Sequence, residues 1–199
     1  MAEEKEMSFL QHVEELRSHL VRSVLAILVG AILAFAFTSV LFDVVLFGPF
    51  QEDFPTKVLL CNLAESLNTP NLCLGELNIE RLQNIVFAGQ FTWHIWACFL
   101  AGVVLAFPYI LYEVWRFIRP ALRKEEKGKV RGIVFYSSIL FFTGALFGYY
   151  VLSPMTIHFL GNYQVSELIE NRPTFVSYLS TILHLTLGTG LVFELPVFI

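Results

Sequence analysis

The first residues whose types and spacing could support chemistry lie near the N-terminus. Four polar side chains recur there at helical intervals and would share one face of a helix: His12, Glu15, His19 and Arg22. A carboxylate on such a face can accept hydrogen bonds from a cationic partner. The ordinary alternative is the solvated face of an amphipathic helix. The spacing alone leaves both interpretations open.

The second candidate is the segment 108–126, PYILYEVWRFIRPALRKEE. Its aromatic residues Tyr109, Tyr112 and Trp115 follow one another at three-residue steps, which is typical of a belt at a membrane interface. A base-rich loop beside an aromatic belt is common in membrane proteins. That pattern does not explain the adjacent acids Glu125 and Glu126, so this segment is kept as a candidate for binding chemistry.

Glu194 is the third candidate, because it lies within an otherwise apolar run. A carboxylate inside a membrane span costs about 2.5–3.5 kcal/mol on insertion scales, so a functional role is the first hypothesis. His184 precedes it on the same predicted helix, about 80° away around a helix of 3.6 residues per turn. The alternative places Glu194 near the membrane interface, about 20 residues after Pro173.

The three cysteines complete the reactive residues. Cys61 and Cys73 lie 12 residues apart in a segment predicted below to be exported, where oxidation permits a disulfide without requiring one. Cys98 is most simply a small apolar residue of a span. The sequence contains no cluster of metal ligands, no nucleophile motif and no Gly-rich phosphate loop. We therefore expect neither an enzyme nor a bound metal or cofactor.

The elements that hold these side chains are predicted to be membrane helices. The 199 residues are 56% hydrophobic and only 15% charged, whereas soluble domains are about 25% charged. This composition excludes a soluble globular domain, a disordered chain, a coiled coil and a collagen. The net charge of −4 provides no basic surface for nucleic acid.

Four apolar runs are each long enough to cross the hydrocarbon, which takes about 20 residues. They predict a single all-α polytopic domain over residues 1–199, with spans at 23–42, 91–112, 132–153 and 174–199. The spans must be helical because irregular backbone in lipid leaves polar groups unpaired. The fourth run reaches Ile199 without a flanking charge. We therefore expect this span to be incomplete and the chain to be truncated.

Basic residues predict the orientation of these spans. Ten of the 13 Lys and Arg fall in the segments 1–22 and 113–131, and three fall in 43–90 and 154–173. Because base-rich loops stay on the cytoplasmic side, we expect the N-terminus to be cytoplasmic. Residues 1–22 would then form a cytoplasmic amphipathic helix and 113–131 a cytoplasmic loop. The segments 43–90 and 154–173 would be exported loops.

Four motifs occur in order along the chain. They are HVEELR at 12–17, a P-x-x-x-Y-x-x-W-x-F-x-x-P-A-L-x-x-x-E pattern at 108–126, an aromatic and glycine pattern at 141–159, and FELP at 193–196. Together they resemble the TatC family, the multispanning receptor subunit of the twin-arginine protein translocase. The resemblance runs from residue 12 to residue 196. The family has six spans, whereas four are present here.

The resemblance implies a site that binds signal peptides bearing consecutive arginines. Glu15 and Glu126 would accept the guanidinium groups, as forked hydrogen bonds to carboxylates require. Phe117 would contact the apolar part of the peptide, and Arg17 and Lys124 would orient the polar groups. Surface ion pairs contribute only about 0–1 kcal/mol each, so useful affinity needs both carboxylates together with apolar packing.

The resemblance also implies the wider role. The chain would be a core subunit that exports folded proteins across the bacterial cytoplasmic (inner) membrane, driven by the proton gradient. It would work in an oligomer with single-span TatA- and TatB-type subunits, and Glu194 would polarise a cavity within the membrane. The alternative is a secondary transporter or channel that uses Glu194 and His184 as an ion site. The lack of an internal repeat counts against that alternative.

Overall fold

A computed structural model describes residues 9–69, 73–74, 82–119, 130–166 and 172–198. The helices are α1 (Phe9–Ala36), α2 (Pro55–Ser66), α3 (Gly89–Ile118), α4 (Val130–Phe147), α5 (Ser153–Asn162) and α6 (Phe175–Phe198). Short π and 3-10 segments accompany them: η1 (Val40–Leu46), η2 (Gly48–Phe50) and η5 (Gly148–Leu152). In the described part of the chain, extended pairing is limited to an isolated bridge between Gln83 and Thr174. The all-α prediction is confirmed.

Four helical segments are long and apolar enough to cross a membrane. They are Val13–Ala36, Gly89–Ile118, Gly132–Asn162 and Phe175–Val197. Large apolar side chains remain exposed along them, among them Leu25, Ile32 and Leu195. So much uncovered apolar surface is unfavourable in water and favourable in lipid. The prediction of a four-span helical membrane protein is therefore confirmed.

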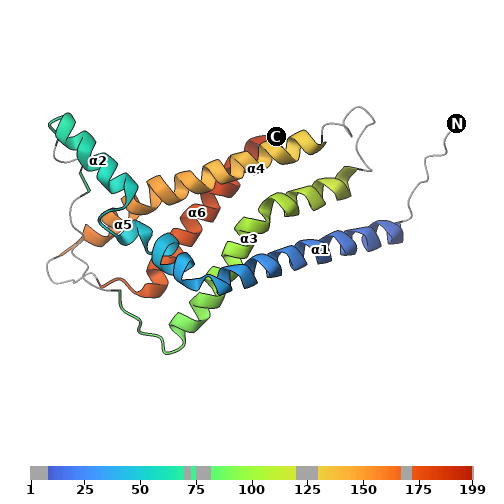
Figure 1. The fold of residues 1–199 in the computed structure, drawn as a ribbon, viewed down its shortest axis with the longest axis horizontal. Helices are drawn as coiled ribbons and strands as arrows, with labels where there is room; N and C mark the ends of the chain where they lie inside the picture. The colour runs from blue at the N-terminus through green and yellow to red at the C-terminus, as the bar shows by residue number, and fades with distance from the viewer. Residues whose placement is uncertain (1–8, 70–72, 75–81, 120–129, 167–171, 199) are drawn as a thin grey trace.

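The spans pack as two pairs, α1 with α3 and α4 with α6, and α3 also contacts α4 and α6 (Figure 1). Two glycines let the first pair approach closely, as small residues do between membrane helices. A Cβ on Gly102 would lie 2.6 Å from the Ala31 nitrogen and from the Ile27 carbonyl oxygen. Gly30 meets the Gly102 backbone from the opposite side. The close contact fixes how α1 lies along α3.

The helices continue across several of the predicted segment boundaries. The predicted cytoplasmic helix 1–22 and the first span form one continuous helix, α1, and α3 continues through residues 113–118 of the predicted loop. The helix of the third span continues past residue 153, since α4, η5 and α5 run without a break to Asn162. Pro154 lies just after η5 and has no N–H to donate to the preceding turn, so the π segment lies where a regular helical hydrogen bond cannot form.

The predicted exported loop 43–90 contains a helix of its own, α2. Lys57 on α2 is buried, and its Nζ donates to the Phe50 carbonyl at 3.2 Å. Burial lowers the pKa of Lys57, while the acidic side chains of Glu52 and Asp53 raise it in part. This hydrogen bond therefore joins η2 to the first turn of α2.

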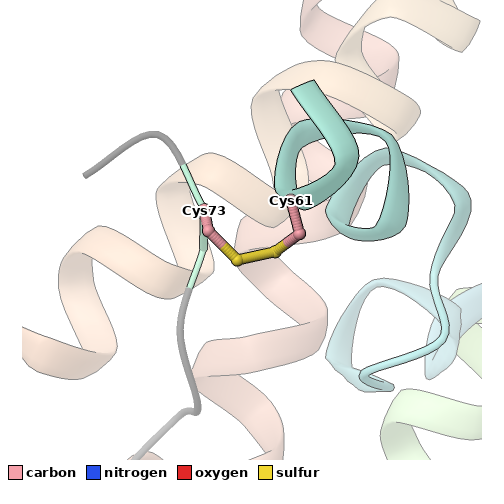
Figure 2. Close-up of a disulfide and its surroundings, with 2 residues drawn as sticks. All are labelled: Cys61 and Cys73. Carbon is pink, nitrogen blue, oxygen red and sulfur yellow. A yellow bond between two sulfur atoms is a disulfide. The ribbon is translucent and has the colours of Figure 1, made fainter. Parts of the chain in front are cut away.

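Cys61 on α2 is joined to Cys73 by a disulfide, with the two Cα atoms 4.2 Å apart (Figure 2). α2 and α5 lie at one end of the molecule (Figure 1). The start of α1, the end of α3 and the start of α4 lie toward the other end. The segments predicted to be cytoplasmic thus share one end, although their orientation in a membrane stays a prediction.

Candidate functional site

The polar face of α1 packs against α3. His19 on that face is only 7% exposed, whereas Leu20 on the apolar face is 61% exposed. Val13 and Leu16 are also exposed. An amphipathic helix in water would show the reverse arrangement, but lipid favours apolar side chains outside and polar side chains against the protein. A solvated face is therefore the wrong interpretation for His19.

His19 meets a carboxylate that the sequence analysis did not select. Its Nδ1 lies within hydrogen-bond contact of Oε2 of Glu113 on α3, a residue only 1% exposed. The hydroxyl of Tyr109, one turn earlier on α3, hydrogen-bonds to the same carboxylate, and Arg22 attracts it electrostatically. The Phe117 ring meets the His19 ring edge-on, with centroids 6.1 Å apart. These five residues form the α1–α3 polar cluster.

A sequence signal for Glu113 existed. Tyr109, Glu113 and Phe117 recur every four residues and so share one face of α3. The aromatic residues of this segment also fit an interface belt, and that interpretation does not select the acid among them. Its partner lies 94 positions away, so only the packing of α1 on α3 identifies the pair.

Glu15 lies one turn before His19 on α1 and is half-buried. Its Oε2 atom is buried and has no hydrogen-bond partner in the described residues. Leaving a buried acceptor unsatisfied costs about 1–3 kcal/mol, and a cationic donor arriving at Glu15 would offset that cost. The neighbouring Glu14 and Arg17 are exposed.

Of the five predicted peptide-binding residues, Phe117 belongs to the α1–α3 polar cluster and Glu15 lies next to it along α1. Glu15 precedes His19 by one helical turn, and Phe117 contacts the His19 ring near the end of α3. Arg17 lies on α1 with its side chain exposed. Lys124 and Glu126 fall outside the described residues, so their roles stay predictions.

Glu194 and His184 do not converge on one site. Glu194 is 3% exposed and lies beside the Ser137 hydroxyl and the Phe141 backbone of α4, but neither of its carboxylate oxygens has a partner with full hydrogen-bond geometry in the described chain. His184 is exposed on α6 and lies 3.1 Å from the hydroxyl of Ser180. An ion site needs ligands around one cavity, so this arrangement does not support the transporter alternative. Nor do three His, Cys, Asp or Glu side chains gather into a metal-binding group within the described ranges.

A family model described as Sec-independent protein translocase protein (TatC) matches residues 11–199. The chain belongs to the TatC family. A TatC from Blattabacterium sp. subsp. Periplaneta americana (strain BPLAN) is 40% identical over 199 residues, which cover 99% of this chain and 74% of that relative. A TatC from Desulforapulum autotrophicum is 32% identical over 98% of this chain and 63% of the relative. The chain thus spans 63% to 74% of the length of these two TatC proteins.

Solved structures agree with the family assignment. One described as "Crystal Structure of Twin Arginine Translocase Receptor- TatC in DDM" has a TM-score of 0.71 and 29% identity. The match covers 94% of this chain and 73% of that one. The predicted resemblance to TatC, and with it the translocase class and the helical membrane fold, is confirmed. TatC proteins are components of a protein translocase, and the solved relative is described as a twin-arginine translocase receptor.

Proposed function

We propose that this chain binds twin-arginine signal peptides at the ends of α1 and α3. It would do so as a core subunit of a translocase that exports folded proteins across the bacterial cytoplasmic membrane, driven by the proton gradient. The observation that carries the proposal is Glu15. Its half-buried carboxylate has one oxygen without a hydrogen-bond partner in the described residues, and it lies one helical turn before His19, whose ring the Phe117 ring contacts.

The binding chemistry follows from the geometry of a guanidinium group. Each arginine offers a planar fork of N–H donors that matches the two oxygens of a carboxylate. Glu15 would take one arginine, and Glu126 would take the other. Phe117 is half-buried at the end of α3 and would pack against the apolar stretch of the peptide, while Arg17 and Lys124 would orient the carboxylates.

Membrane partners would act on the other surfaces. The exposed apolar faces of the spans are suited to lipid and to helices of single-span TatA- and TatB-type subunits. The unpartnered carboxyl of Glu194 would polarise the membrane interior where such a helix, or the signal peptide, inserts. A polar side chain on the inserted helix would supply the missing hydrogen bond.

The test measures peptide binding by the full-length protein in lipid nanodiscs. Glu15→Gln keeps the size of the side chain but removes the charge that holds a guanidinium. We expect it to weaken binding of a labelled twin-arginine peptide about tenfold, equivalent to about 1.4 kcal/mol. Glu14→Gln is the matched control, because Glu14 is an exposed neighbour on the same helix, and its affinity should stay within about twofold.

Glu126→Gln with Glu125→Gln as its control repeats the comparison on the second segment. If Glu15→Gln and Glu14→Gln bind the peptide with equal affinity, Glu15 does not hold an arginine. Equal affinities for the position-126 and position-125 variants would remove Glu126 from the site.

A further inference from the structure

The α1–α3 polar cluster contains a buried pair of side chains that takes no direct part in the proposed peptide binding. Its central pair, His19 and Glu113, is buried and joins two helices. Both side chains are inaccessible to a peptide, so neither can be a direct ligand. Burying such groups is costly unless they are paired, and removing one partner leaves the other unsatisfied. The pair therefore favours one arrangement of α1 against α3 over shifted alternatives.

The position of this pair relates it to the peptide site. Glu15 lies one turn before His19 on α1, and Phe117 lies one turn after Glu113 on α3. One turn of four residues is about 6 Å along a helix. Any slip of α1 along α3 would therefore change the distance between Glu15 and Phe117 directly. The Phe117 ring also rests on the His19 ring, so the histidine supports the aromatic side of the site.

We propose that His19 and Glu113 are positioning residues that set the specificity of the site for arginine over lysine, an inference that rests on the proposed function. His19 donates from Nδ1 to the Glu113 carboxylate and holds α1 in register. The register fixes the Glu15 carboxylate for a forked guanidinium. A lysine ammonium is a point charge on a flexible stem and tolerates displacement of the carboxylate, whereas a bidentate guanidinium does not.

The test compares two synthetic signal peptides that differ only in a pair of arginines or a pair of lysines. Affinities are measured with the full-length protein in nanodiscs. Glu113→Leu removes the acceptor, and we expect about a tenfold loss of affinity for the arginine peptide and less than about a threefold change for the lysine peptide. Glu113→Gln keeps an acceptor oxygen for His19 and should retain most of the discrimination.

A control at the opposite end of the same helix pair separates positioning from general weakening. Thr38 Oγ1 on the α1 side and His94 Nε2 on α3 lie 3.1 Å apart. Thr38→Val removes this contact far from the peptide site and should leave the arginine-to-lysine affinity ratio unchanged. Equal loss of that ratio in Thr38→Val and Glu113→Leu would overturn the positioning role.

If Glu113→Leu does not fold, a double variant tests the positioning role instead. The exchange His19→Glu with Glu113→His restores a buried acid and imidazole pair with the partners swapped. Recovery of the affinity ratio relative to His19→Glu alone supports the proposal, and failure to recover it overturns the proposal. If the unmodified protein shows no preference for arginine, the proposed function itself fails. A preference that survives in Glu113→Leu refutes only the inference.

Discussion

Three acidic side chains in this membrane domain differ in whether their buried oxygens have hydrogen-bond partners. Glu113 is paired with His19, whereas the buried oxygens of Glu15 and Glu194 have no hydrogen-bond partner in the described residues. A satisfied buried pair stabilises one packing arrangement, and an unsatisfied acceptor favours an incoming donor. The three carboxylates therefore fit three different roles: positioning, peptide binding and contact within the membrane.

The disulfide provides a test at the scale of residues. Cys61 and Cys73 are joined, and Cys98 is free and buried. Protein isolated from membranes under oxidising conditions and alkylated after unfolding should gain two more adducts with reductant than without it. Intact-mass spectrometry measures the difference. Equal numbers of adducts in both samples would contradict the bridge and would also question the export of this segment.

Residue types in an unusual context could be selected from the sequence, but their partners could not. Glu194 is selected because a carboxylate within an apolar run is costly, and Glu15 because it lies on a polar helix face and matches the resemblance to TatC. The pairing of His19 with Glu113 depends on a contact between residues 94 positions apart, and helical periodicity carries no information about such a contact. The sequence also could not distinguish a polar face toward water from one toward a neighbouring helix.

At the scale of whole helices, the sequence predicts the spans but not the residues at which the helices end. The four spans could be predicted because each has a long uncharged run. Their ends could not be predicted, since α1 and α3 extend past the apolar core and keep their backbone hydrogen bonds outside it. The third span passes through the π segment η5 before Pro154, and that local widening of the helix has no simple sequence signature.

The closeness of α1 and α3 leads to a prediction for this helix pair. Gly102→Ala places a methyl group 2.6 Å from backbone atoms of Ala31 and Ile27, and backbone atoms cannot move aside as a side chain can. We expect the free energy of unfolding to fall by about 1–3 kcal/mol, the usual cost of overpacking. Thermal unfolding of the full-length protein in detergent measures the change.

Gly188→Ala on α6 is the matched control, because a Cβ there meets no atom within 4 Å. Alanine has the higher helix propensity, so this variant should be neutral or more stable by up to about 1 kcal/mol. Equal destabilisation by the two substitutions would contradict the close contact between α1 and α3.

The whole molecule separates a candidate binding end from an end that contains α2 and its disulfide (Figure 1). The four apolar runs predicted the number of spans, and the ordered motifs predicted the family, which the comparisons confirm. The grouping of α1 with α3 and of α4 with α6 was not predictable from the sequence, because every span is apolar on most of its surface. That grouping is what brings His19 on α1 to Glu113 and Phe117 on α3.

The central claim is that a twin-arginine peptide binds where α1 meets the end of α3. The most direct test replaces Phe117 in the full-length protein with a photoreactive phenylalanine analogue and irradiates it with a labelled signal peptide. Tyr136, exposed on α4, carries the same analogue as the control. We predict a peptide adduct from position 117 that is lost when lysines replace the paired arginines, and none from position 136. No adduct at 117, or equal adducts with both peptides, would contradict the account.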